Sequence, residues 1–489
     1  MNLREQLERT TGGVAAAGQA VTPATALRLR AASAVAASVV ALALVATFAL
    51  DRSAAARGAL PLFGTVAINL LLVAGMWTVL RQLRPEVVRS GRALGFLGAL
   101  GALVVAVTAV AMRVVPDAPE LVPMAFAAIV VSALYDRRLG VLVVACIAML
   151  VAVQPAYRTS SALTVMLASG ATAALMVRPV GRRDQSYLWM FATAAVMVGV
   201  LTLSGVARGL GQSDIVASLV RGVGATVVSV IAAVLCLPLA ERWTGRETHL
   251  TLLEWGDLNR PLLQRLSLEA PGTYAHTIAI ANLAEAACRA IGANAVLARV
   301  GAYYHDIGKL AKPQYFVENQ PRGRNLHDKL KPQTSASIIR NHVREGLELA
   351  DAERMPRSIR AFITEHHGTN TISFFLEKAR EREGAVSNSG GEYNYPGPVP
   401  QSIETAVVML ADGAEAATRA LPDPTPDRIR EVIEAVVRQR LEQGQLRDAP
   451  LTLGQLTIVK QQFARVLGGM YHARIDYPTP ALGIEAVSR

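Results

Sequence analysis

Long apolar runs dominate the first half of the chain, whereas the second half alternates apolar and polar positions with helical periodicity. A membrane helix needs about 20 apolar residues, because each residue rises about 1.5 Å through a hydrocarbon core about 30 Å thick. We therefore predict an all-α chain with a multi-span helical membrane domain followed by an all-helical soluble domain. The apolar runs are 31–50, 59–80, 93–115, 119–135, 139–153, 161–177, 187–206 and 222–240.

The loops between these runs predict the topology. Short cytoplasmic loops are enriched in Arg and Lys. With eight spans, the cytoplasmic segments would be the N-terminal tail and the loops 81–92, 136–138 and 178–185, which are richer in arginine than the loops on the other side. Both termini are then in the cytoplasm. The fourth to sixth runs are near the lower length limit for a span, so buried or re-entrant segments are an alternative for them.

The first run, 31–50, is expected to be a retained helix rather than a cleaved signal peptide, because the next apolar run follows after only eight residues. Many small residues, as in 95–101, would permit close helix packing or a homodimer. Ionisable groups are almost absent from the runs, which argues against a transporter. Arg113 and Arg221 lie near predicted ends and are expected to snorkel to the interface.

The net charge of +11 has the same origin. Residues 1–250 carry 21 arginines and 11 acidic residues, whereas residues 251–489 carry 28 basic and 27 acidic residues. The basic excess therefore belongs to the membrane domain. The soluble half has no basic stripe interleaved with aromatic residues, so binding to long nucleic acid is not expected. The three cysteines have no paired spacing, so neither a disulfide framework nor a thiolate metal site is indicated.

The composition changes near residue 245, where lysine appears and charged residues become frequent. We predict a cytoplasmic tail over 1–30, a transmembrane domain over 31–243, a soluble domain over 244–475 and a C-terminal tail over 476–489. A loop is expected at 384–400, which is rich in Gly and Pro. Within the soluble domain, helices are predicted at about 274–291, 294–307, 333–350, 356–367, 371–383, 401–420, 426–444 and 453–472.

The soluble half also holds a dispersed set of metal-ligand candidates: His276, His305, Asp306, His342, His366, His367 and Asp412. An adjacent His-Asp pair at a helix end can give an imidazole to one cation while its carboxylate bridges two cations about 3.5–4 Å apart. His342 could instead be a buried structural imidazole. Neighbouring helical residues point about 100° apart, so His366 and His367 can share an ion only if the chain leaves the helix there. Asp412 follows an apolar run, where an unpaired carboxylate is costly and a metal would remove that cost.

Several segments around these residues resemble a known family. In chain order they are PGTYAHT, RVGAYYHDIGK, YFVENQ, NLHDKLKP, SASIIRNHV, ITEHHGT and YNYPGPVPQSIETAVVMLAD. Over about residues 250–475 the chain resembles the HD-superfamily hydrolases fused to seven-transmembrane receptor-like regions, the PgpH-type cyclic di-AMP phosphodiesterases of bacteria. The resemblance implies a multi-pass protein of the bacterial inner membrane whose cytoplasmic HD domain cleaves cyclic di-AMP to 5′-pApA.

The resemblance also implies a ligand set for two divalent ions, iron or manganese. His276, His305, Asp306 and Asp412 would hold one ion, and Asp306 would bridge to a second ion. The remaining histidines, His342, His366 and His367, would hold that second ion, with one of the last two free to contact phosphate. Imidazole and carboxylate donors without thiolate are compatible with iron, manganese or zinc.

Other residues are candidates for contact with the cyclic dinucleotide. Lys309 would act with Asp306 in catalysis through a charge-assisted contact with a phosphate oxygen, unless it is a solvated lysine beyond a helix end. The substrate-binding candidates besides Lys309 are His367, Tyr303 and His327, although Tyr303 is equally expected in the core and His327 in an ordinary loop.

Neighbouring acidic residues have simpler alternatives. Glu365 would orient a metal ligand or be an exposed helical acid. Glu415 and Arg419 have ion-pair spacing, and no further role is expected for them.

Two other functions stay open. The first is a phosphohydrolase of cyclic di-GMP or another nucleotide; the Tyr-Pro that would follow His-His-Gly in the cyclic di-GMP class is replaced by Thr369-Asn370. The second is a receptor that binds nucleotide without turning it over. Many family members carry a large extracytoplasmic domain after the first span, yet only residues 51–58 separate the first two runs here. A signal is therefore expected to enter through the spans, their short loops or the membrane.

Overall fold

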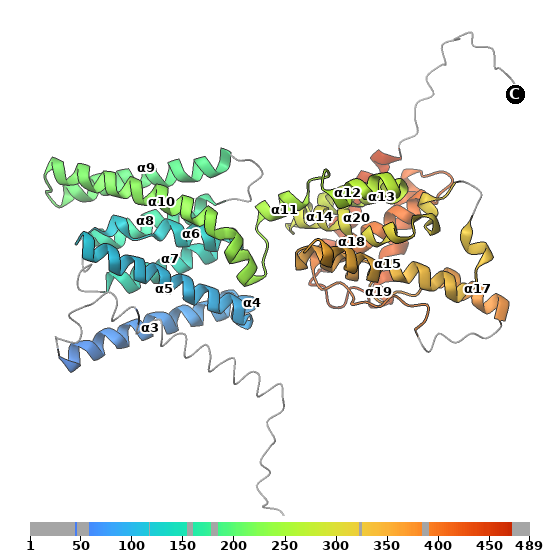
Figure 1. Cartoon of the computed structure of the whole chain (residues 1–489), viewed down its shortest axis with the longest axis horizontal. Coiled ribbons are helices and arrows are strands. Elements are labelled where there is room, and N and C mark those ends of the chain that lie inside the picture. The colour runs from blue at the N-terminus through green and yellow to red at the C-terminus, as the bar shows by residue number, and fades with distance from the viewer. Residues whose placement is uncertain are drawn as a thin grey trace, which may run out of the picture. The chain divides into compact units, whose positions relative to one another are not determined.

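The computed structural model describes residues 45, 58–116, 118–153, 160–177, 184–321, 325–383 and 391–471. These residues form helices, and the only β pairing among them is one isolated bridge between Thr371 and Asn394. The predicted all-α fold class is confirmed. The chain divides into two compact units between Gly245 and Arg246 (Figure 1). The predicted boundaries at residues 30 and 475 lie outside the described residues.

The first unit contains a helix at each apolar run from the second to the eighth, while the run 31–50 lies outside the described residues apart from Val45. Its main helices are α3 (Ala59–Leu83), α5 (Gly91–Val114), α6 (Met124–Leu134), α7 (Arg137–Ala152), α8 (Ser160–Met176), α9 (Asp184–Ala207) and α10 (Gln212–Thr244), with the short α4 (Pro85–Arg89) and η1 (Pro119–Leu121) between them. Within the described part of the chain, four segments are long and apolar enough to cross a membrane: α3, α5, Tyr187–Ala207 of α9, and α10.

Burial distinguishes the helices of the first unit. The fourth run divides into η1 and α6, and α6 is buried around its circumference because it packs against α7, α8 and α10. Its 11 residues rise only about 16 Å, much less than the hydrocarbon thickness. The helix α10 begins ten residues before its predicted run. Arg221 of α10 was expected to snorkel to the interface. Instead, it pairs with another residue of the unit, because its Nε lies 2.8 Å from Oε1 of the buried Glu120.

The second unit contains all eight predicted helices, with ends shifted by a few residues. The helices are α11 (His249–Trp255), α12 (Pro261–Glu269), α13 (Pro271–Ala290), α14 (Ala295–Tyr304), α15 (Pro332–Ala352), α16 (Arg357–Glu365), α17 (Ser373–Glu383), α18 (Ile403–Arg419), α19 (Pro426–Glu442) and α20 (Leu453–Met470). The short α11 and α12 were not predicted, nor were the 3-10 turns Ile307–Ala311, Pro313–Tyr315, Val317–Asn319 and Leu326–Lys329.

Two helices, α13 and α18, form the centre of this unit. The helix α13 packs against α14, α18 and α20, and Figure 1 shows these helices side by side. A capping box between Ser402 and Thr405 starts α18, which then buries its apolar residues from Ala406 to Ala411 in the core. Because α13 carries His276 and α18 carries Asp412, the packing of the two helices brings these side chains together.

Candidate metal centre

Three of the candidate histidines are oriented by their own helices. In each of them the Nδ1–H donates to a backbone carbonyl three or four residues earlier. A carbonyl can only accept, so Nδ1 carries the proton and Nε2 is left with its lone pair. The pairs are His305 with Ala302 (2.7 Å), His342 with Ile339 (2.6 Å) and His366 with Phe362 (2.8 Å). All three rings are therefore set to present Nε2 as a ligand.

The fourth imidazole, His276, is oriented by a carboxylate. Its Nδ1 lies 2.6 Å from Oε2 of the buried Glu415, and its Nε2 lies 3.1 Å from Oδ1 of Asp412. A carboxylate behind a ligand histidine fixes the ring and raises its basicity. The expectation that Glu415 has no role beyond an ion pair with Arg419 is therefore wrong, although that pair exists at 3.3 Å.

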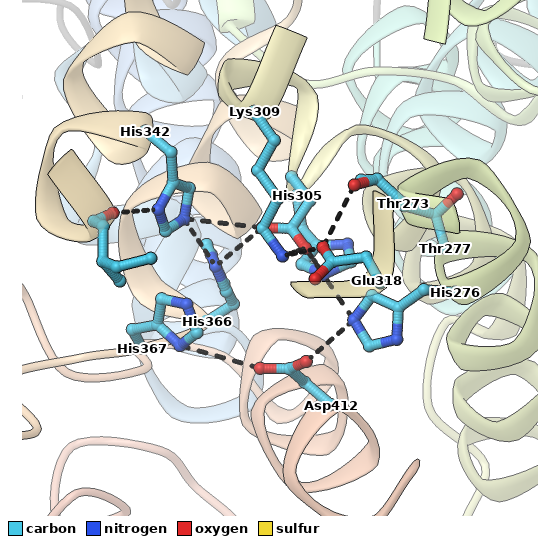
Figure 2. Close-up of polar contacts among 12 residues, drawn as sticks. Thr273, His276, Thr277, His305, Lys309, Glu318, His342, His366, His367 and Asp412 are labelled. Atoms are coloured by element: carbon cyan, nitrogen blue, oxygen red, sulfur yellow. Dashed lines mark hydrogen bonds and ion pairs between the residues drawn. The ribbon is translucent and has the colours of Figure 1, made fainter. Parts of the chain in front are cut away.

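Asp306 directs one carboxylate oxygen to each side of the site. Its Oδ1 lies 3.4 Å from Nε2 of His342 and 3.6 Å from Nε2 of His366. Its Oδ2 lies 3.2 Å from Nε2 of His305 and 3.8 Å from Nε2 of His276. Figure 2 shows the histidines converging from both sides. This is the arrangement that a carboxylate needs to bridge two cations.

The ligand atoms fall into two groups. Asp306, His342, His366 and His367 form one, and His276, His305 and Asp412 form the other, with the ligand atoms within 4.8 Å of one another in each group. Asp412 joins the groups, since its Oδ2 also lies 3.6 Å from Nδ1 of His367. Two buried ligand atoms, Nε2 of His305 and Oδ1 of Asp306, have no hydrogen-bond partner among the described residues. Because burying polar atoms unpaired is costly, the residues fit a dimetal HD site.

The surroundings of the site favour the ligand protonation state of Asp306 and His342 but not that of His276. Burial alone would raise the pKa of Asp306, but the Lys309 ammonium and His305 hold it well below its usual value. Burial also lowers the pKa of His342 to about 4. In His276, burial is outweighed by hydrogen bonds with the carboxylates of Asp412 and Glu415, which raise its pKa to about 9. A cation at this group must therefore displace a proton from His276.

Lys309 lies within the site. Its Nζ is 2.8 Å from Oδ2 of Asp306 and 2.7 Å from Oε1 of Glu318, and the side chain is 12% exposed. The alternative of a solvated lysine is therefore wrong. The same oxygen of Glu318 accepts from Oγ1 of Thr273 at 3.1 Å, as Figure 2 shows. The two contacts of Glu318 thus link the segment YFVENQ to the segment PGTYAHT and hold the Lys309 ammonium beside Asp306.

Two glycines permit the close backbone approaches around the ligands. A Cβ on Gly308 would lie 1.8 Å from the carbonyl oxygen of His342 and 2.5 Å from the amide nitrogen of Gly346. A Cβ on Gly272 would lie 1.9 Å from the carbonyl oxygen of Glu318. No larger side chain fits at these distances. Gly308 therefore lets the His305-Asp306 segment lie directly against α15.

The chain leaves the helix at the paired histidines. The helix α16 ends at Glu365, His366 is its C-cap, and Gly368 follows with φ +54°. Because the chain leaves the helix here, the rings of His366 and His367 can both face the same ligand group. Glu365 itself is buried, and its carboxylate accepts hydrogen bonds from the backbone N–H of Gln401 (2.9 Å) and from the hydroxyl of Thr405 (2.7 Å). The exposed alternative for Glu365 is wrong, since its carboxylate anchors the end of α16 to the start of α18.

The other predicted substrate residues lie in different surroundings. Tyr303 is 3% exposed in the hydrophobic core, and its hydroxyl accepts from Nε of Arg299 at 2.6 Å. His327 is also buried, and its ring contacts Tyr315 and Phe375. The structure does not bring either residue into the two ligand groups. Their contacts with substrate stay predictions.

Two further residues, Tyr395 and Arg440, lie near the ligands. The ring of Tyr395 stacks on His367, with centroids 4.1 Å apart and planes inclined by 29°. Burial lowers the pKa of the Arg440 guanidinium, while the charges of Asp412 and Tyr395 oppose this. The Nε of Arg440 is buried and lacks a hydrogen-bond partner in the described part of the chain. Arg440 is thus a cation beside the site with an unused donor.

Comparison with known proteins agrees with this geometry. The family described as a 7TM receptor with intracellular HD hydrolase matches residues 59–248, and the HD domain family matches residues 273–417. The cyclic-di-AMP phosphodiesterase PgpH of Bacillus subtilis (strain 168) is 38% identical over 287 residues, which are 59% of this chain and 38% of that protein. PgpH of Listeria monocytogenes serotype 1/2a is 36% identical over 365 residues, 73% of this chain and 50% of that protein.

The chain thus spans half or less of the length of these curated relatives. Among solved structures, the HD domain of L. monocytogenes PgpH in complex with cyclic di-AMP is 40% identical. It is matched over 44% of this chain and 100% of that chain, with a TM-score of 0.43.

Proposed function

This chain belongs to the family of 7TM receptors with an intracellular HD hydrolase domain, and we propose that it is a membrane-anchored phosphodiesterase that hydrolyses cyclic di-AMP to 5′-pApA. The observation that carries the proposal is the carboxylate of Asp306, which directs one oxygen to each of two ligand groups. The names of the relatives supply the substrate. The catalytic domain would lie in the cytoplasm beneath a transmembrane domain over residues 31–243.

The proposed ligands follow the two groups. His276, His305 and Asp412 would hold one cation, His342, His366 and His367 the other, and Asp306 both. Bound there, two divalent cations such as iron or manganese would supply a water of lowered pKa and positive charge for the phosphodiester oxygens. The chain's own part is to hold the imidazoles in one orientation and to keep both carboxylates ionised, as the low pKa values of Asp306 and Asp412 indicate.

Positively charged side chains around the metal ligands would bind the substrate phosphates. Lys309, held by Glu318 at 2.7 Å, places an ammonium beside the bridging carboxylate, where it can contact a phosphate oxygen. The guanidinium of Arg440, whose Nη2 would lie 3.9 Å from a Cβ on Gly413 next to Asp412, would add a second positive charge. Tyr395 packs on His367 and would keep that ring facing Asp412 rather than stack on an adenine. Lys309 and Arg440 would thus supply positive charge, and Tyr395 an aromatic ring, next to the place where the phosphates are proposed to bind.

The competing functions have weaker support. A cyclic di-GMP enzyme would share the metal site, but Thr369 and Asn370 replace the Tyr-Pro of that class after Gly368. The backbone amide of Thr369 is also bonded to Gln445 at 2.9 Å, which fixes this segment in another way. A receptor that binds nucleotide without turnover would not need seven ligand residues. Their presence favours an enzyme.

The experiment is a product assay on the fragment 246–489, loaded with manganese or iron and given cyclic di-AMP and cyclic di-GMP side by side. We expect cyclic di-AMP to be converted to 5′-pApA, and Asp306→Ala to abolish turnover by removing the bridging ligand. Faster cleavage of cyclic di-GMP would overturn the substrate. Near-normal turnover by Asp306→Ala with two metals bound would overturn the mechanism.

A further inference from the structure

A small cavity lies at the end of the membrane unit where α10 begins. It is formed by η1, α8, α9, α10 and the turn between the last two helices. The HD domain of this family is intracellular, and the other end of α10, Thr244, directly precedes the second unit. Because α10 is long and apolar enough to cross the membrane, the cavity lies at the extracytoplasmic end of the bundle.

A buried carboxylate that belongs to an ion pair forms part of the wall of this cavity. Glu120 of η1 is 3% exposed, and its Oε1 accepts from Nε of Arg221 at 2.8 Å. The Nη2 of Arg221 donates to Oγ of Ser218 at 3.0 Å. Burying the charged carboxylate of Glu120 is costly, because it loses hydration that its partner must replace. Membrane proteins retain such groups chiefly where they serve a function.

The cavity also contains a cation without an acidic partner. Arg208, an exposed residue of the turn between α9 and α10, lines it, as Glu120 does. No carboxylate among the described residues lies within ion-pair distance of the Arg208 guanidinium. The lining holds one carboxylate, Glu120, and one guanidinium, Arg208, and because Arg221 outside the lining already pairs with Glu120, the charge of Arg208 is left without a partner in the described part of the chain. That balance favours an anion.

We propose that this cavity binds a small oxyanion, such as a phosphate group, through Arg208. The planar fork of a guanidinium matches the oxygens of phosphate and carboxylate, which a point charge does not. The hydroxyls of Ser204 and Ser218 also line the cavity and can donate to the same oxygens. Phosphate could reach this site either free in solution or as the headgroup of a phospholipid.

The cavity is tightly coupled to α10. A Cβ on Gly222 would lie 2.5 Å from Cδ1 of Leu201, and one on Gly205 would lie 2.7 Å from Cγ1 of Ile215, so α9 and α10 touch without free space. Leu201 and Ile215 line the cavity, and Arg221 precedes Gly222. An anion bound in the cavity would therefore lie against the first turns of α10, whose last residue, Thr244, directly precedes the second unit.

The test is the binding of labelled inorganic phosphate to the full chain in nanodiscs of neutral lipid, in the presence of a chelator that keeps metals out of the HD site. Arg208→Gln is compared with Arg113→Gln, an exposed arginine in the last turn of α5 that does not line the cavity. We expect Arg208→Gln to weaken one class of phosphate site by about tenfold or more, the value of a charge-assisted contact. Wild type and Arg113→Gln should bind alike.

Two further measurements keep the inference falsifiable. Native mass spectrometry shows whether wild type instead retains a phospholipid that Arg208→Gln loses, which would assign the oxyanion to a headgroup. In the wild-type chain, phosphate should protect Arg208 but not Arg113 from phenylglyoxal. Equal phosphate and lipid binding by all three proteins, or modification of Arg208 unaffected by phosphate, would overturn the site. None of these measurements depends on phosphodiesterase activity.

Discussion

The contact between Gly308 and α15 allows a sharp test of the metal centre. In Gly308→Ala the new Cβ would lie 1.8 Å from the carbonyl oxygen of His342 and 2.5 Å from the amide nitrogen of Gly346. Carbon atoms need at least about 3 Å at such contacts, so one segment must move by roughly 1 Å. Both clashing atoms are backbone and cannot rotate away. The movement therefore displaces His342, a proposed metal ligand, from Asp306.

The magnitude follows from the size of this clash. Overpacking a well-packed core costs about 1–3 kcal/mol, and a backbone clash belongs at the upper end. For a domain of this size each kcal/mol lowers the melting temperature by about 2–4 °C, so we expect a fall of roughly 6–12 °C. Metal sites also require ligands within about 0.5 Å of their productive position. The ion held by His342 should therefore bind less tightly.

The assay is thermal unfolding of the fragment 246–489 by far-ultraviolet circular dichroism, together with metal content after dialysis. Gly454→Ala is the matched control, because Gly454 lies near the start of α20 with no atom within 4 Å of a new Cβ. Alanine has the higher helix propensity, so the control should be as stable as wild type or slightly more stable. If Gly308→Ala melts at the wild-type temperature with two metals bound, the close contact between Gly308 and the backbone of α15 is refuted.

Three other substitutions separate metal binding from substrate binding. Glu415→Gln should weaken metal binding at the His276 group by about 10–100-fold, because the carboxylate behind the imidazole is lost; the exposed Glu434→Gln is the control, and equal metal affinity in both would exclude this role. Lys309→Ala should lower turnover without loss of metal, and unchanged kcat and KM would remove Lys309 from the site. Arg440→Gln should raise the KM for cyclic di-AMP by about tenfold or more with metal content intact, whereas a change in metal content alone would assign Arg440 to the ligands.

Sequence predicted most of the helices because their signals are local. Runs of continuous apolarity marked the membrane helices, and helical periodicity marked most of the soluble ones. The short α11 was missed because seven residues give too few turns for a periodic pattern, whereas α12 was missed although α16, which also has nine residues, was predicted. The partner of Arg221 was missed for another reason. Glu120 is 101 residues away, and only the packing of η1 on α10 joins them.

The residues of the site also differ in whether the local sequence marks them. The structure brings all seven candidate ligands together, and they were recognisable because they stand in motifs. The residues that orient them have no such mark. Glu415 is 139 residues from His276, and its spacing to Arg419 suggested an ordinary surface pair. Arg440 lies on α19 in a charged, mostly exposed sequence, where nothing local distinguishes the one arginine that turns inward.

The hydrogen bonds from His305, His342 and His366 to their own helices have a consequence for assembly. Each imidazole ring loses its rotational freedom when its helix forms. The side-chain conformational entropy is therefore lost during folding and not when a cation binds. In a zinc finger, by contrast, the metal supplies the folding free energy, and its removal unfolds the protein. Here the emptied pocket should keep its shape and accept ions again. Such an enzyme could be switched off and on by metal supply without being remade.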